Sequence, residues 1–401
     1  MKSKILNPRG RVGEGSQNLS FTVDLSVERD SRLIGPLKNK RNNKDAVGGF
    51  SGTREKIRID DAIPSLDKVK RKNKIRSAKS RLTSKEILYF TLSAAIIICM
   101  SAIMIRPDRY SKAFENGLSL FVLNVLPAIF PYLFFTKILS SLGVPEKMAK
   151  LLRKPLKIFG LPSSCAFLVV MSFISGYPMG AKLTKELYDD GGLSSSGARA
   201  ATALTSISGP IFIIGTVGAA IFKSVKAGFI LYAANFAASI LNGLVWRNKN
   251  YVDTPMTANI NKAKLSDAVY DTVMTVLVVG GYIAIFNMVA DMLKDFGVIE
   301  GLSNAIDLVP IIRDSGASEG LVYGLLEMTK GCMTLSKAGT NALILAFSAG
   351  VTAFGGLSVI IQSVTFLSAC KVSFGSFLIR KITQSLFAFL ICLAISLLIG
   401  V

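Results

Sequence analysis

Seven stretches of this sequence are long and apolar enough to cross a bilayer as helices, and this feature limits the possible folds most strongly. A bilayer core about 30 Å thick needs about 20 apolar residues in a helix. Such stretches lie at 87–105, 117–135, 200–222, 228–246, 268–292, 341–367 and 383–401. The mean hydropathy of +0.47 over 401 residues is too high for a water-soluble globule. The sequence therefore predicts an all-α, polytopic membrane helix bundle.

Two further apolar stretches are short and interrupted, and we expect them to form re-entrant hairpins. The first, 165–183, is broken at Ser175-Gly176-Tyr177-Pro178, and the second, 320–335, is broken around Thr329 and Gly331. In the predicted topology the first hairpin enters from the cytoplasm and the second from the opposite face. This arrangement is typical of transporters built from inverted repeats.

Each hairpin is followed by a span that carries helix-breaking residues in its middle. The span 200–222 contains Ser208-Gly209-Pro210, and the span 341–367 contains Gly355-Gly356. Proline removes a backbone donor and paired glycines add freedom, so we expect both helices to unwind there. Unwound backbone at this depth is tolerated where it is buried in protein or lines a wet cavity.

These breaks and hairpin tips lead to the hypothesis of one polar pocket for a solute. The alternative is that small residues simply let the helices pack closely. The residues predicted to contact the solute are Ser175, Gly176, Tyr177, Pro178, Ser208, Gly209, Pro210, Glu327, Thr329, Gly331, Gly355 and Gly356.

Glu327 is the strongest single candidate, because a charge inside a membrane segment costs roughly 2.5–3.5 kcal/mol on insertion scales. Its carboxylate could bind a cation, a proton or a hydroxylated solute. The alternative is a local pair with Lys330, three residues on. For Lys182 we favour a side chain that extends to the cytoplasmic interface.

Residues 1–82 predict a basic, mostly disordered cytoplasmic tail, and residues 83–401 predict the transmembrane domain. The first 85 residues hold 22 basic and 9 acidic side chains, with little apolar periodicity. We expect Lys70, Arg71, Lys72, Lys74 and Arg76 to contact the membrane surface, where anionic lipids attract basic residues. The alternative is a topology determinant without a specific partner; nucleic acid is disfavoured because no aromatic residues are interleaved.

The distribution of basic residues predicts a multi-pass protein of the cell membrane with its N-terminus in the cytoplasm. The tail, the loop after 135, the loop after 246 and a third loop containing Lys371, Arg380 and Lys381 then lie inside. Several other lysines and arginines fall on the outer side, so the excess of positive charge in the cytoplasmic loops is a bias and not a strict partition.

Several classes of chemistry have no suitable residues in this sequence. The chain has no histidine, and its five cysteines form no CxxC pair. It also lacks a Gly-rich phosphate loop followed by Lys-Ser or Lys-Thr. We therefore expect no enzyme, no metal site and no cofactor, and an ion gradient or the solute's own gradient as the energy source.

Four motifs occur in the order expected of one known family. They are SGYPMGAK at 175–182, TSISGPIFIIGTVG at 205–218, EMTKG at 327–331 and FGGLSV at 354–359. This combination resembles the YlbJ-type sporulation integral membrane proteins of the nucleoside-recognition Gate domain group. The resemblance extends from about residue 86 to residue 401, and the basic tail has no counterpart in it.

The resemblance implies a membrane protein of endospore-forming bacteria that acts in sporulation and is needed for the spore cortex. The Gate group is similar to concentrative nucleoside transporters and to the pore part of ferrous-iron transporters, which implies that the tips and breaks form a solute site. We therefore expect a transporter or channel for a small polar solute, with a coupling cation as a further partner. The alternative function is a non-transporting scaffold or assembly factor at the forespore membranes.

Overall fold

The computed structural model describes residues 84–249 and 265–400, and every regular element in these two ranges is a helix. The all-α prediction is confirmed for this part of the chain. The first range contains α2 (Ser84–Ile105), α3 (Pro107–Leu120), η2 (Phe121–Val125), α4 (Leu126–Ser141), α5 (Val144–Ile158), η3 (Ser163–Cys165), α6 (Ala166–Ser175), α7 (Met179–Asp189), α8 (Ser195–Thr205), η4 (Ile211–Ile221) and α9 (Val225–Val245). The second contains α10 (Leu265–Asp295), α11 (Val298–Ile306), α12 (Pro310–Ser315), α13 (Ser318–Leu326), α14 (Met328–Leu335), η5 (Ser336–Ala338), α15 (Ala342–Phe354), α16 (Gly356–Leu367), η6 (Ser368–Cys370) and α17 (Phe374–Ile399).

Five helical segments in the described ranges are long and apolar enough to cross a membrane, and two bent pairs raise this number to seven. The five are Glu86–Ile105, Val225–Val245, Ser266–Asp295, Ala342–Cys370 and Phe374–Ile399. The bent pairs are Pro107–Val125 with Ile129–Ser141, at 53°, and Val144–Ile158 with Ser163–Ser175, at 107°. These segments agree with a multi-pass membrane protein.

The predicted span 200–222 is not one continuous helix. Helix α8 ends at Thr205, residues 206–209 are not helical, and η4, a π-helix, begins at Ile211. The break in the span 341–367 is narrower: α15 and α16 meet at Gly355, which has a φ of 85°. Both breaks therefore lie where the Gly and Pro residues predicted them.

The last helix begins at Phe374 and not at residue 383, and this corrects one prediction. The Ser373 hydroxyl accepts a hydrogen bond from the Ser376 amide at 3.3 Å and caps the helix at that point. As a result Arg380 and Lys381, predicted to lie in a cytoplasmic loop, are inside α17 and buried. The count of positive charges per loop gave no information about which face of this helix is buried.

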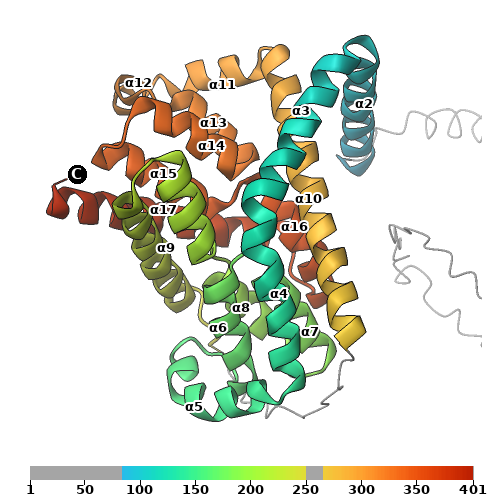
Figure 1. Cartoon of the computed structure of the whole chain (residues 1–401), viewed down its shortest axis with the longest axis vertical. Helices are drawn as coiled ribbons and strands as arrows, with labels where there is room; N and C mark the ends of the chain where they lie inside the picture. The colour runs from blue at the N-terminus through green and yellow to red at the C-terminus, as the bar shows by residue number, and fades with distance from the viewer. Residues whose placement is uncertain (1–83, 250–264, 401) are drawn as a thin grey trace, which may run out of the picture. The chain divides into compact units, whose positions relative to one another are not determined.

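The same order of elements occurs twice along the chain (Figure 1). A long or bent helix (α3–α4, then α10) is followed by short helices (α5, then α11 and α12). A helical hairpin comes next (α6–α7, then α13–α14), then a broken helix (α8–η4, then α15–α16) and a final long helix (α9, then α17). This recurrence agrees with the predicted repeat. The opposite orientation of the two sets in a bilayer and the re-entrant position of the hairpins stay predictions.

Helices α9, α15 and α17 pack closely against one another. Small residues make this approach possible: Ala234, Ala238, Ala346, Ala349 and Ala388 are all fully buried. Helix α2 differs from these helices, because its most apolar stretch is not buried inside the structure. It touches the bundle where Ala102 meets Tyr110 and Met292.

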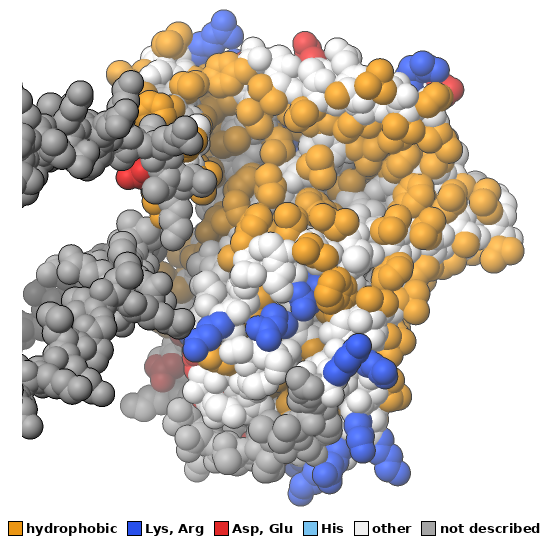
Figure 2. All heavy atoms as spheres, turned by 180° about the vertical axis from the view of Figure 1, so that it is seen from behind, with side chains coloured by type: hydrophobic (Ala, Val, Ile, Leu, Met, Phe, Trp, Pro, Cys, Tyr) orange, Lys and Arg blue, Asp and Glu red, His pale blue; other side chains and the backbone are white. Residues whose placement is uncertain are grey.

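The outer surface carries a broad apolar area, as expected for a chain in contact with lipid. Figure 2 shows hydrophobic side chains over most of the upper part of one face, with Lys and Arg concentrated in the lower part. At the lower end of Figure 1 lies α5, whose sequence carries Lys147, Lys150, Arg153, Lys154 and Lys157. An apolar belt with one basic end is the pattern that the positive-inside rule describes.

Candidate functional site

The two hairpin tips and the first helix break surround one small cavity, and the second break closes against both tips. The cavity has a volume of about 40 Å³, which is room for a few water molecules. Its polar lining comes from Tyr132, Ser175, Tyr177, Ser208, Glu327 and Gln362. The rest of the wall is mainly apolar and includes side chains of α4, η4, α10 and α16. Segments more than 150 positions apart in the sequence thus meet at one point.

The first tip, between α6 and α7, packs directly on the first break. Gly176 has a φ of 75°, and a Cβ atom there would lie 2.0 Å from the Gly209 amide nitrogen, so only glycine fits. The Tyr177 hydroxyl is within hydrogen-bond distance of the carbonyl oxygens of Ser206, at 2.8 Å, and Ala353, at 3.0 Å. Tyr177 therefore joins the first tip to both broken helices.

The second tip, between α13 and α14, is built around Glu327. This residue is extended and 2% exposed, and its carboxylate accepts hydrogen bonds from the Thr329 hydroxyl at 3.0 Å and the Lys330 amide at 2.8 Å. It is thus the N-cap of α14. Gly356, with a φ of 74°, lies so close to the second tip that a Cβ atom would be 2.9 Å from the Leu326 carbonyl oxygen.

The first break is tied to the second half of the molecule by Ser208. Its hydroxyl donates to the Thr352 carbonyl oxygen at 3.1 Å and lies 3.8 Å from the Met328 sulfur. Gly209 lines the cavity, and Pro210 follows it as the first residue before η4. The two halves therefore contact each other at the place where their helices are interrupted.

Most of the predicted solute-contacting residues are brought together, although not all of them reach the cavity. Ser175, Tyr177, Ser208, Gly209 and Glu327 line it. The others, Gly176, Pro178, Pro210, Thr329, Gly331, Gly355 and Gly356, shape the tips and breaks around it. For Gly331 the packing alternative holds, since a Cβ atom there would lie 2.4 Å from the Gly324 Cα in the facing helix. Solute binding by this set stays a prediction.

The side chain of Lys330 does not pair with Glu327. Its ammonium forms an ion pair with Asp291 of α10 and lies 4.9 Å from the centre of the Tyr323 ring. The Glu327 carboxylate contacts the backbone of Lys330 instead. The carboxylate at the cavity therefore has no direct ion-pair partner among the described residues.

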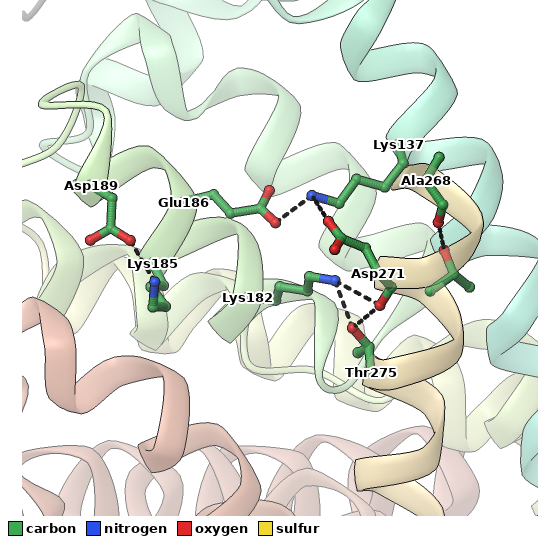
Figure 3. Close-up of polar contacts among 9 residues, drawn as sticks. Lys137, Lys182, Lys185, Glu186, Asp189, Ala268, Asp271 and Thr275 are labelled. Carbon is green, nitrogen blue, oxygen red and sulfur yellow. Dashed lines mark hydrogen bonds and ion pairs between the residues drawn. The ribbon is translucent and has the colours of Figure 1, made fainter. Parts of the chain in front are cut away.

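A second charged network ties the first hairpin to the other end of α10 (Figure 3). Lys137 of α4 lies 2.6 Å from Glu186 of α7 and 3.4 Å from Asp271 of α10. Lys182 of α7 donates to the Thr275 hydroxyl at 2.6 Å and is thus directed at α10. The cavity-lining residues Val279 and Ile283 lie on α10 between Asp271 and Asp291, so each hairpin is held to this helix on one side of the cavity.

Lys381 is a residue of this site that the sequence analysis did not identify. Its ammonium is 1% exposed and donates to the Tyr177 hydroxyl, to the Ser206 carbonyl oxygen at 2.9 Å and to Gln384 Oε1 at 3.0 Å. The sequence contained one signal, a run of small or polar residues at helical spacing on the buried face of α17. Its members are Lys381, Gln384, Ala388, Cys392 and Ser396.

Two other predictions concern the tail and metal ions. The predicted membrane-surface contacts, Lys70, Arg71, Lys72, Lys74 and Arg76, lie outside the described residues, as does the boundary at 82. Within residues 84–249 and 265–400, no group of three or more His, Cys, Asp or Glu side chains has the geometry to hold a metal ion.

Comparison with known proteins supports the resemblance inferred from the motifs. Residues 122–228 match the family model Gate, described as nucleoside recognition. This range includes the first tip and the first break. The chain is also 26% identical over 332 residues to the sporulation integral membrane protein YlbJ of Bacillus subtilis (strain 168), covering 74% of this chain and 80% of the relative. No solved structure matches the chain.

Proposed function

Taking the chain as a multi-pass membrane homologue of a sporulation integral membrane protein, we propose that it is a transporter or channel for a small polar solute needed for spore cortex formation. It acts in the cell membrane, with its N-terminus in the cytoplasm. One observation carries the proposal: both hairpin tips and a helix break enclose a single cavity with a buried carboxylate. Paired, interrupted helices of this kind form the binding sites of many transporters.

The cavity lining favours a solute with hydroxyl or amino groups. A mainly apolar wall with a few convergent polar groups is typical of small-molecule sites. Glu327 supplies a negative charge, and the buried Ser175 hydroxyl has no hydrogen-bond partner among the described residues. A cavity of about 40 Å³ is too small for a metabolite, so we assign this conformation to the closed state of the cycle.

The charged networks on α10 support alternating access to the cavity. Asp271 holds the α6–α7 hairpin through Lys137 and Glu186, and Asp291 holds the α13–α14 hairpin through Lys330. Release of the Asp271 network would open the end near α5, which we place at the cytoplasm, and release of the Lys330–Asp291 pair would open the opposite end. The bundle then carries out no chemical reaction, and its partners are the solute, a coupling cation and membrane lipids.

Ligand-dependent thermal stability of the purified protein tests this proposal. The panel consists of nucleosides, dipicolinate, amino acids and divalent metal ions, measured on wild type, Glu327→Gln and the matched control Glu319→Gln. A ligand present at 100 times its Kd stabilises the folded state by about 2.7 kcal/mol. Gln at position 327 keeps an oxygen that can accept from the Lys330 amide but removes the charge. Glu319 lies on the same hairpin, half exposed, and pairs with Lys294 at 3.3 Å.

We expect at least one compound to raise the melting temperature of wild type and of Glu319→Gln but not of Glu327→Gln. The same compound should then be taken up by proteoliposomes that contain wild type. If no compound acts on wild type and Glu327→Gln still restores sporulation in a deletion strain, the transport proposal is wrong. The scaffold function would then be the better explanation.

A further inference from the structure

The buried ammonium of Lys381 lies where the first hairpin tip, the first break and the end of α15 meet. Three oxygens surround it, from the Tyr177 hydroxyl, the Ser206 carbonyl and the Gln384 side chain, and the ammonium lies 4.7 Å from the centre of the Tyr177 ring. A protonated lysine has three N–H donors. The number of acceptors therefore matches the charged form.

One of these acceptors lies at a helix C-terminus, which carries partial negative charge, and a second is hydrogen-bonded to another helix C-terminus. Ser206 is the C-cap of α8. The Tyr177 hydroxyl is also 3.0 Å from the carbonyl oxygen of Ala353, in the last turn of α15. Helix C-termini favour cations, and the C-terminal ends of broken helices are where transporters commonly coordinate a coupling Na⁺ or proton. Here a side chain of the protein occupies such a position.

No carboxylate faces Lys381 from the helices that pack against α17. The helices that pack most closely against α17 are α8, α9, α15 and α16, and their charged residues are Arg199 and Lys226; their titratable uncharged residue is Tyr232. On α17 itself, Arg380 turns away to Ser376 and to the Trp246 ring, and Cys392 lies three turns further on. Glu327 lines the same cavity as Tyr177 but is bonded to Thr329 and Lys330. Among the described residues, the Lys381 charge is thus balanced by dipoles.

We propose that Lys381 is a proton-binding site that takes the place of a bound metal cation at the helix break, so that the proton is the coupling ion. This inference rests on the proposed transport function. In the step itself one Nζ–H bond breaks, the electron pair stays on nitrogen, and the proton passes to water that enters the cavity beyond Tyr177. Rebinding of a proton from the other side of the membrane completes the exchange.

Proton loss would loosen the first tip for a simple reason. A neutral amine has two N–H donors and cannot serve three acceptors at once. In the neutral form the Tyr177 hydroxyl would donate to the amine lone pair instead of to the carbonyl oxygen of Ser206 or Ala353, so one contact between the tip and the broken helices is lost. Binding and release of a single proton are thereby linked to a movement at the cavity wall.

The single tryptophan of the chain offers a direct test. Trp246 donates to the Thr383 hydroxyl at 3.0 Å, and the Arg380 guanidinium lies 4.7 Å from its ring centre, so it contacts residues on both sides of Lys381. Full-length protein in lipid nanodiscs, without any solute, is titrated from pH 5 to pH 10 while Trp246 fluorescence and the melting temperature are recorded. The variants are Lys381→Arg, Lys381→Met and the matched control Lys226→Met, an exposed lysine on the helix of Trp246.

We expect wild type and Lys226→Met to show the same one-proton transition. Lys381→Arg should stay at the acidic plateau and Lys381→Met at the alkaline plateau over the whole range. Tyr177→Phe keeps the lysine but removes one acceptor of the ammonium, so its transition should differ from that of wild type. This variant also serves if Lys381→Met does not fold.

A transition that persists in Lys381→Met, or a wild type without a transition in either readout, would overturn the proton site. Neither result would affect the transport proposal, because no solute is present. A protein that titrates as expected but binds no compound of the panel would remove the transport proposal and, with it, the role of the proton as coupling ion.

Discussion

The tip of the α6–α7 hairpin and the tip of the α13–α14 hairpin meet at the same cavity, but opposite charges hold them. At the second tip the charge is a carboxylate of the tip itself, and Glu327 caps the helix that follows it. At the first tip the charge is an ammonium from α17, more than 200 positions away, which reaches Tyr177 and Ser206. The charge at the second tip is therefore hydrogen-bonded within the tip itself, whereas the charge at the first tip comes from a distant helix. This difference suggests that the second hairpin moves as a unit and that movement of the first is tied to α17.

The largest effect should come from separating the first tip from its break. Gly176→Ala places a Cβ atom 2.0 Å from the Gly209 amide nitrogen at a positive φ. We therefore expect the free energy of unfolding to fall by about 3 kcal/mol or more. Gly356→Ala, with a contact at 2.9 Å, should cost about 2 kcal/mol. Gly191→Ala, at a φ of 72° in open space, should cost about 1 kcal/mol. Melting temperatures in detergent give the order, and equal losses at 176 and 191 would contradict it.

The next effect concerns the long-range support of the first tip. Tyr177→Phe removes the hydroxyl that joins Lys381 to two broken helices, and we expect the free energy of unfolding to fall by about 1–3 kcal/mol. The control Tyr232→Phe removes one hydrogen bond, to the Phe173 carbonyl oxygen at 3.2 Å, and should cost about 1 kcal/mol. Hydrogen exchange should rise in both α7 and α15 of Tyr177→Phe. If hydrogen exchange rises only in α7, the contacts of the first tip act over as short a range as those of the second.

A smaller and more confined effect is expected at the second tip. Glu327→Ala leaves the Lys330 amide without its capping acceptor and should cost about 1 kcal/mol. Because this cap stabilises only the start of α14, hydrogen exchange should increase in α14 and remain unchanged in α7. Glu327→Gln keeps an acceptor and should show little of this change. If exchange in α7 also rises in Glu327→Ala, the two tips are coupled more tightly than their contacts indicate.

The smallest effects on stability, but opposite effects on access, should come from the ion pairs on α10. Lys137→Met removes the ion pairs with Glu186 and Asp271, and Lys330→Met removes the pair with Asp291; these partly exposed pairs are worth about 1 kcal/mol each. A cysteine at position 279, in the cavity wall, reports access to membrane-impermeant thiol reagents in vesicles of known orientation, on a Cys99→Ser background. We expect Lys137→Met to raise labelling from the α5 end and Lys330→Met to raise it from the α11 end.

The control for this experiment is Lys185→Met, which breaks an exposed pair with Asp189 inside α7. It should leave labelling unchanged from both sides. Labelling that increases from the same side in Lys137→Met and Lys330→Met would mean that the two ion pairs do not guard opposite entrances.

The sequence was sufficient for those features that depend on local chemistry. Gly and Pro residues predicted the first tip and both breaks, and the cost of a charge in an apolar segment singled out Glu327. The second tip was predicted around Thr329 and Gly331, but it lies at Glu327, and both residues are inside α14. Lys381 could not be found in this way, because Arg380 beside it and its position before an apolar run made it resemble an interface cation. Its burial depends on which face of α17 meets α9 and α15, and that is decided by tertiary packing. For the same reason the alternative partner that the sequence offered for Lys330 was its neighbour Glu327, whereas its partner is Asp291 of α10.

The two ion-pair networks on α10 also have an electrical consequence. Asp271 and Asp291 are 20 positions apart on one helix, and at 1.5 Å per residue this is about 30 Å, the thickness of the hydrocarbon core. The cavity lies midway between them, so a charge that travels from either entrance to the cavity crosses roughly half of the membrane potential. One elementary charge crossing 100 mV changes its energy by about 2.3 kcal/mol. At that potential, movement of one charge between an entrance and the cavity would therefore change its energy by about 1.2 kcal/mol. Voltage would then act on entry and on exit about equally, whichever entrance is open.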